Sequence, residues 1–156
     1  MIRSALIALL TTVSLGTASH VLANEDKITK GFYSMDAMGC MLLRECTDGV
    51  DEVFSLLDIS SQYDDPERYT PVALEFNNML MAMNQVGSKV FLADERYFPP
   101  NHRGVYHTVS NNIYLNRKYM DAPHYLMSVM RHEGWHAAQD CMAGSIKNNM
   151  IAIIHN

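Results

Sequence analysis

The sequence has no basic cluster, no basic amphipathic helix and no long apolar run after residue 23. Without a basic surface, a nucleic-acid partner is not expected. Without a basic amphipathic segment, binding along a membrane surface is not expected either. A helix that spans a bilayer needs about 20 consecutive apolar residues, and no later stretch approaches that length. These absences favour a soluble globular protein.

Cysteine is scarce: the chain has Cys40, Cys46 and Cys141, and none of them forms a CxxC pair. A zinc site built from cysteines is therefore not expected. Two cysteines six apart on one helix point about 120° away from each other, so Cys40 and Cys46 could pair only if the helix ended early. Cys46 stands beside the turn 47–49 and is the expected disulfide partner of Cys141. Three free thiols remain the alternative, because the count is odd.

The first 23 residues have the features of a signal peptide. Arg3 gives a positive start, residues 5–15 are mostly apolar, and 21–23 fit a signal peptidase site with cleavage after Ala23. The apolar stretch is too short to span a bilayer, although an uncleaved anchor remains the alternative. We therefore expect a secreted or periplasmic protein with no membrane contact beyond export. Residues 24–156 would form one domain with a net charge of −6, from 11 Lys and Arg minus 17 Asp and Glu.

Hydrophobic spacing, capping residues and turn residues predict helices first, then strands, then one long helix. The expected elements are helices at 34–45 and 51–57, a loop at 60–69, a helix from Thr70-Pro71 to Gly87, strands at 89–92, 104–109 and 113–115, and a helix from 121 to 144. This order predicts an α+β domain with N-terminal helices, a small three-stranded sheet and a long C-terminal helix.

The last predicted helix contains the motif H-E-x-x-H as His132, Glu133 and His136. Residues four apart lie on the same helix face, so both imidazoles can bind one zinc ion. Glu133 is offset by one position, and its carboxylate can take the proton of a water that zinc has acidified to a pKa of about 7. The pattern predicts Zn²⁺ as the cofactor, the two histidines as ligands and Glu133 as the general base that activates water for attack on a carbonyl carbon.

Chance does not readily produce this motif. His and Glu each occur seven times in 156 residues, so about (7/156)³ × 152, or about 0.014, occurrences are expected. An ordinary polar helix face with two surface histidines is the alternative.

Residues 132–144 read H-E-G-W-H-A-A-Q-D-C-M-A-G. This segment resembles the zincin metallopeptidases and, within them, the active-site helix H-E-x-x-H-A-x-x-D-x-x-A-G of the thermolysin-like gluzincins. The resemblance implies a zincin-like fold, a peptide or protein substrate, zinc binding by His132 and His136, and catalysis by Glu133. Asp140 matches an aspartate of that family and is expected to orient His136 from one turn away. The preceding hairpin is similar to the zincin edge strand that pairs with an extended substrate.

The third zinc ligand of the gluzincins has no counterpart here, because it is a glutamate beyond the motif and no Glu follows Glu133. The third histidine of the metzincins would fall on Met142, which excludes that subclass. Asp140 is eight residues from His132, or about 12 Å along a helix, and cannot easily take the place of the missing ligand. His155 is the only downstream histidine and is the candidate third ligand.

Three explanations for the missing ligand stay open: a chain truncated at its C-terminus, ligation by His155, and a weak two-histidine site. The apolar run 151–154, close to the last residue, favours truncation. The upstream histidines are expected on the surface or in strands; they are His102, His107 and His124.

Two other functions are alternatives to a metallopeptidase. A zincin-like protein without a third ligand would bind zinc and a partner without catalysis. Peptide deformylase also uses H-E-x-x-H, but its cysteine ligand lies in a glycine-rich motif that is not found here. Export also argues against a deformylase.

Overall fold

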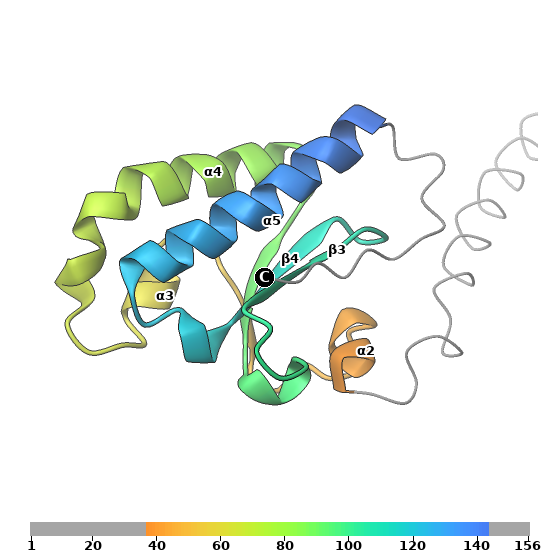
Figure 1. Cartoon of the computed structure of the whole chain (residues 1–156), viewed down its shortest axis with the longest axis horizontal. Helices are drawn as coiled ribbons and strands as arrows, with labels where there is room; N and C mark the ends of the chain where they lie inside the picture. Colours follow the sequence, from red (N-terminus) through yellow and green to blue (C-terminus); the bar gives the residue numbers. More distant parts are fainter. Residues whose placement is uncertain (1–36, 144–156) are drawn as a thin grey trace, which may run out of the picture.

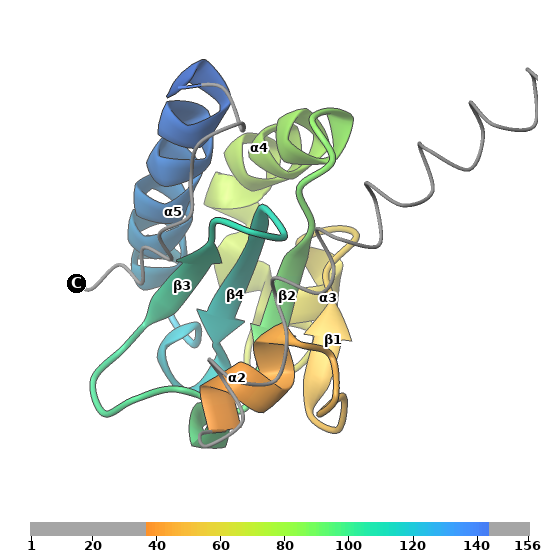
Figure 2. The same cartoon turned by 90° about the vertical axis from the view of Figure 1, so that its right-hand side faces the viewer.

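The computed structural model describes residues 37–143, which are built around a four-stranded sheet with the strand order β1-β2-β4-β3 (Figure 2). The strands are β1 (Val50–Glu52), β2 (Val90–Ala93), β3 (Gly104–His107) and β4 (Asn112–Asn116). β2 runs parallel to β4, whereas β1 and β3 are antiparallel to their neighbours. Among the described strands, β3 therefore forms one edge of the sheet.

Several sequence expectations fall outside the described residues. They are the signal peptide over residues 1–23, the start of the first helix, the apolar run 151–154 and the candidate ligand His155.

Helices cover both faces of the sheet (Figures 1 and 2). α4 (Ala73–Gln85) and α5 (Pro123–Ala143) pack on one face, and α2 (Ala37–Leu42) packs on the other. Shorter helical segments complete the described chain: α3 (Leu57–Ser60), η1 (Pro66–Val72), η2 (Glu95–Tyr97) and η3 (Arg117–Tyr119). No helix between residues 37 and 143 has the length and apolar character needed to cross a membrane. The fold is α+β.

The sheet is stabilised from both faces by hydrophobic clusters. The larger cluster fills the space between the sheet and the helices α4 and α5, and it includes the fully buried Phe76 and Leu126. Successive residues of a strand point to opposite faces, so Ile113 and Leu115 of β4 join this cluster while Tyr114 joins the one beneath α2. Burying one large apolar side chain contributes about 1.5–3 kcal/mol, so this two-sided packing is the main stabilising interaction of the sheet.

The predicted hairpin and the long last helix are confirmed. β3 and β4 pair antiparallel, and Asn111 in the turn takes a φ of 59°, which asparagine tolerates better than most residues. α5 begins at Pro123, where a proline costs no intrahelical hydrogen bond, and it continues for 21 residues.

Within residues 37–143 the sheet already has four strands, so the prediction of three was wrong. The segment expected as a helix over 51–57 instead begins with β1, which pairs with β2. Over seven residues, apolar spacing is a weak signal, and pairing with a neighbouring strand outweighed it. Gly49 makes the turn into β1 at a φ of 72°, and a Cβ there would lie 2.0 Å from a carboxylate oxygen of Asp94. Glycine is therefore required at this turn.

The helix expected from Thr70-Pro71 begins earlier and in a different form. The chain first forms the 3-10 helix η1 from Pro66, and the α-helix starts only at Ala73. Pro66 is the first residue of η1, where a proline lacks only an N–H that would have no partner, whereas Pro71 lies inside η1, two residues before α4 begins. The predicted loop over 60–69 is correspondingly shorter.

The disulfide joins Cys40 to Cys46, and Cys141 is an exposed free cysteine. The expected Cys46–Cys141 bridge was wrong. α2 ends at Leu42, earlier than expected, and Arg44 then takes a left-handed conformation at a φ of 58°. The backbone N–H of Cys46 donates to the carbonyl of Cys40 at 3.0 Å, which brings the two Cα atoms to 5.2 Å.

Peptide mapping without reductant is expected to recover a Cys40–Cys46 cross-linked peptide, and alkylation of the unreduced protein should label Cys141 alone. Reduction should lower the free energy of unfolding by about 2 kcal/mol, because the closed loop is short. Urea unfolding with and without reductant measures this difference. A Cys46–Cys141 peptide would contradict the structure.

The buried His107 should make stability depend on pH. Burial lowers its pKa to about 4, whereas an unfolded histidine titrates near 6.5. The unfolded state therefore binds the proton first as pH falls, so this contribution is complete above pH 6.5 and is lost toward pH 4. Between pH 7 and pH 5, urea unfolding should show a loss about 1–2 kcal/mol greater for the wild type than for His107→Asn. An equal loss in both proteins would contradict this assignment.

Candidate metal centre

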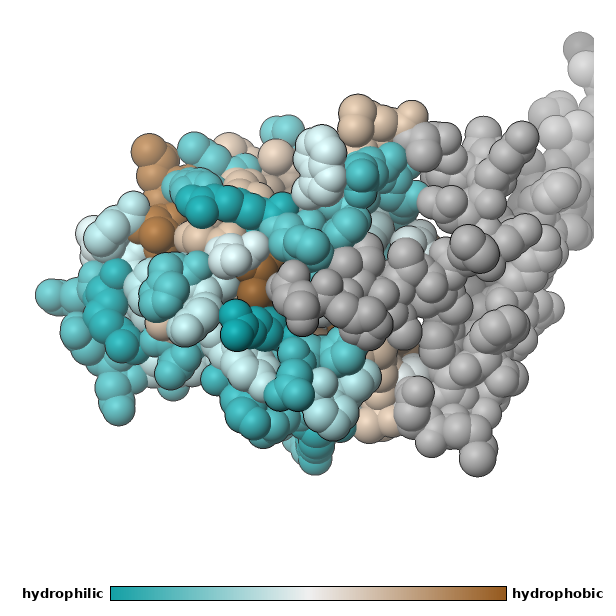
Figure 3. All heavy atoms as spheres, in the orientation of Figure 1, coloured by the Kyte–Doolittle hydropathy of each residue, from teal (hydrophilic) through white to brown (hydrophobic). Residues whose placement is uncertain are grey.

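α5 packs along β3 and carries the H-E-x-x-H motif in its middle turns (Figure 1). Val129, on the sheet side, is buried, whereas Trp135 is 59% exposed. His132 and His136 are half-buried, at the boundary between these two faces. The space-filling view in the same orientation shows mainly hydrophilic residues on this side of the molecule (Figure 3). The histidines are thus placed by a helix whose one side is fixed in the core.

The two imidazole rings approach each other across one helical turn. Nε2 of His132 lies 3.2 Å from Nε2 of His136, and the ring planes meet at 76°. Two nitrogens that bind one tetrahedral zinc ion at about 2.0–2.1 Å lie about 3.3 Å apart. Partial burial lowers the pKa of His132, and the neighbouring His136 lowers it further, which favours the neutral form that binds metal. The pair fits two positions of a zinc site.

Glu133 lies between α5 and β3 and is fully buried. Within the described part of the chain, neither of its carboxylate oxygens has a hydrogen-bond partner. Burial without a partner disfavours the charged form and raises the pKa of Glu133 to about 8. An unpartnered buried carboxyl destabilises the fold, and such groups are frequent at functional sites. The donor chemistry around the histidines therefore fits a metal centre with an adjacent acid-base group.

Gly104 allows this packing of Glu133. A Cβ at Gly104 would lie 2.6 Å from Cγ1 of Val129 and 3.4 Å from Oε1 of Glu133. Real Cβ contacts are not as short as 2.6 Å, so any larger residue would push β3 away from α5. The glycine thus keeps Glu133 enclosed.

The environment of His136 differs from the expected one. Its Nδ1 lies 3.0 Å from Oε1 of Gln139, which can fix the tautomer and the ring orientation. Asp140, the expected orienting residue, accepts a hydrogen bond of 2.7 Å from the hydroxyl of Tyr106 and so ties the last turns of α5 to β3. Desolvation and the nearby Asp140 both raise the pKa of Tyr106. Gln139 follows His136 by three residues, and residues at that spacing are neighbours on a helix surface, so the sequence contained a signal for this contact.

The described residues do not supply a third ligand. No group of three or more His, Cys, Asp or Glu side chains within residues 37–143 could hold a metal ion. Of the upstream histidines, His107 is buried on β3 with Nδ1 2.7 Å from the hydroxyl of Ser110, His102 precedes β3, and His124 is exposed in the first turn of α5. The candidate ligand His155 lies outside the described residues.

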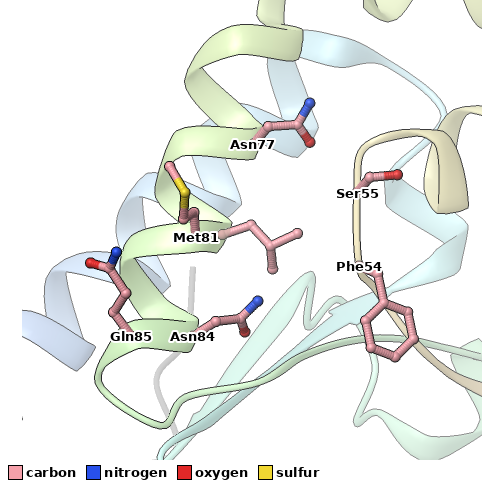
Figure 4. A pocket seen from close by; sticks show the side chains of 7 residues that line it. Phe54, Ser55, Asn77, Met81, Asn84 and Gln85 are labelled. Carbon is pink, nitrogen blue, oxygen red and sulfur yellow. The ribbon is translucent and has the colours of Figure 1, made fainter.

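A pocket lies away from the histidines, between α4 and the segment after β1 (Figure 4). It has a volume of about 480 Å³ and is lined by Phe54, Ser55, Asn77, Leu80, Met81, Asn84 and Gln85. Met79 and Met83 of α4 do not line this pocket, and their methyl groups approach Gly134 of α5. The lining contains no His, Cys, Asp or Glu, so this pocket lacks the groups that bind zinc or transfer protons.

Comparison with protein families, with curated proteins and with solved structures found no match for this chain. The assignment of a candidate metal centre therefore rests on geometry alone.

His132→Ala and His136→Ala should each weaken zinc binding by roughly 100-fold or more, since loss of a direct ligand exceeds the 10–100-fold cost of losing an orienting residue. Isothermal titration with zinc measures the affinity. His124→Ala, on the same helix but exposed, is the matched control and should bind zinc like the wild type. Stoichiometric zinc in the double variant His132→Ala/His136→Ala would refute this centre.

Proposed function

We propose that this chain is a zinc-dependent metallopeptidase of the zincin type, with His132 and His136 as zinc ligands and Glu133 as the general base. The observation that carries the proposal is the 3.2 Å approach of the two Nε2 atoms beside a buried carboxyl group that has no hydrogen-bond partner among the described residues. The spacing of the motif and the gluzincin-like pattern over residues 132–144 support it. The position of α5 beside an edge strand supports a zincin-like fold.

The residues of the site have separate roles in the proposed reaction. Zinc, when bound, would polarise the substrate carbonyl and lower the pKa of a water molecule. Glu133 would accept the proton of that water in its ionised form, which the positive charge of a bound zinc ion would favour, and would donate the proton to the leaving amine. Because its carboxylate oxygens have no partner among the described residues, no hydrogen bond has to break before the proton arrives. Gln139 would hold the ring of His136 in its metal-binding orientation.

The substrate proposed for this site is an extended peptide. β3 pairs with β4 on one side, and among the described strands it has no neighbour on the other. The edge of a sheet offers backbone N–H and C=O groups in a regular row, which an extended peptide can pair with. Since α5 packs on β3, a peptide bound there would pass close to the histidines.

Export is part of the proposal. The first 23 residues have a signal-peptide pattern, and disulfides persist mainly in oxidising compartments such as the periplasm and the cell exterior. The Cys40–Cys46 bond is compatible with such a location.

Zinc-dependent binding without catalysis is the second candidate function. It is favoured by one observation, the lack of a third ligand among residues 37–143. Two histidines alone would hold zinc weakly and leave its position less well defined. The two functions differ in whether any peptide is turned over.

Glu133→Gln should lower kcat by about 10²–10⁴-fold, because the amide cannot accept the proton. Zinc content should be unchanged, since Glu133 is not a ligand. Both are measured on the zinc-loaded full chain, with peptide-library cleavage followed by mass spectrometry and metal analysis of the same sample.

Glu75→Gln is the matched control for this change. Glu75 is an exposed glutamate on α4 that pairs with Arg131, so the variant should retain wild-type turnover. Unchanged kcat in Glu133→Gln would exclude Glu133 as the base. No cleavage of any peptide by the wild type would favour the binding function.

A further inference from the structure

Arg103, directly before β3, lies over two tyrosine rings. Its Cζ is 5.6 Å from the ring centroid of Tyr119 and 5.0 Å from that of Tyr125. Both distances are within the range of about 6 Å for cation–π contacts. Rings stacked against a guanidinium restrict its orientation and leave its N–H groups directed along its plane. Arg103 is half-buried and Tyr125 is 42% exposed, so solvent can reach this cluster of side chains.

Arg103 differs from the paired arginines of the molecule because, within the described residues, its guanidinium has aromatic contacts but no carboxylate partner. The paired arginines are Arg96 with Asp48, Arg117 with Asp51 and Asp94, and Arg131 with Glu75. The chain has an excess of acidic residues, with a net charge of −5. An arginine that is held in place but unpaired can bind a carboxylate of another molecule through two parallel hydrogen bonds.

Arg103 and its two tyrosine rings lie on the same side of α5 as the histidine pair. Tyr125 precedes His132 by seven residues, about two helical turns, so both lie on the same helix face. Seven residues of helix extend about 10.5 Å, and an extended peptide advances about 3.3 Å per residue. A group bound at Arg103 would thus lie about three peptide residues from the histidines. Gly104, the neighbour of Arg103, already approaches Glu133.

We propose that Arg103 binds a carboxylate of the peptide substrate, about three residues from the cleaved bond, so that the enzyme prefers acidic peptides. This inference rests on the proposed metallopeptidase function. The carboxylate belongs to an Asp or Glu side chain or to the C-terminus of a short peptide, since both present the same two oxygens to the guanidinium.

The test uses pools of labelled nonapeptides that are identical except for Glu or Gln at one fixed position. Fluorescence anisotropy measures their binding to the zinc-loaded Glu133→Gln chain, and mass spectrometry locates the bond that the wild type cleaves. We expect the Glu pool to bind and be cleaved about 10- to 100-fold better, with Glu about three residues from the cleaved bond. Pools with a free or an amidated C-terminus distinguish a terminal carboxylate from a side chain.

Arg103→Gln should remove the preference in both assays. Arg44→Gln is the matched control, because Arg44 also lies over an aromatic ring, that of Phe91, which packs against the α2 cluster on the other face of the sheet. This control should keep the preference. Arg103→Glu distinguishes a loss of recognition from a folding defect. If it is folded, this variant should prefer peptides with Lys over peptides with Gln at the same position.

The outcomes separate the two proposals. Equal binding of the Glu and Gln pools, no binding of either, or a preference that survives Arg103→Gln overturns the role of Arg103. Cleavage without an acidic preference does the same and leaves the peptidase function in place. An Arg103-dependent preference in binding without any cleavage supports this role and overturns the peptidase function.

Discussion

The close contact between β3 and α5 at Gly104 is the constraint on which the arrangement of the site depends. Because residue 104 has no side chain, the strand comes close enough for Val129 and Glu133 to reach the position of a Cβ. The same closeness encloses the Glu133 carboxyl and brings Tyr106 of β3 within hydrogen-bond distance of Asp140. One glycine therefore determines where a carboxyl is buried and where two histidines meet solvent.

Two carboxyl groups of α5, those of Asp140 and Glu133, differ in whether a hydrogen bond compensates for burial. Asp140 accepts a hydrogen bond from Tyr106, which offsets the loss of water around it. Glu133 has no partner among the described residues, and burial raises its pKa. The packing of the sheet from both faces supplies enough hydrophobic stabilisation to tolerate one such group. Packing alone does not require this destabilising carboxyl group, so we attribute the burial of Glu133 to the chemistry of the site.

The charged residues of the molecule have separate structural and functional positions. Arg117 bonds to Asp51 and Asp94, which ties η3 to the strands β1 and β2. Among residues 37–143, Arg103 has no carboxylate partner and instead lies over tyrosine rings directly before the edge strand β3. An ion pair between fixed elements consumes the donors of an arginine, whereas stacking leaves them available to a ligand. Arg117 thus ties elements of the fold together, whereas Arg103 is held by aromatic rings.

The sequence by itself determined the elements whose signals are local. The long helix with His132 and His136 one turn apart follows from its proline start and helical spacing, and the hairpin follows from β-prone runs around Asn111. Tertiary structure decided the features that depend on contacts across the chain: the fourth strand, the burial of Glu133 and the tyrosine stack of Arg103. It also decided the Cys40–Cys46 bond, because the end of a short helix depends on what packs against it. Periodicity reports which face of an element is apolar, but only packing determines which distant residues that face meets.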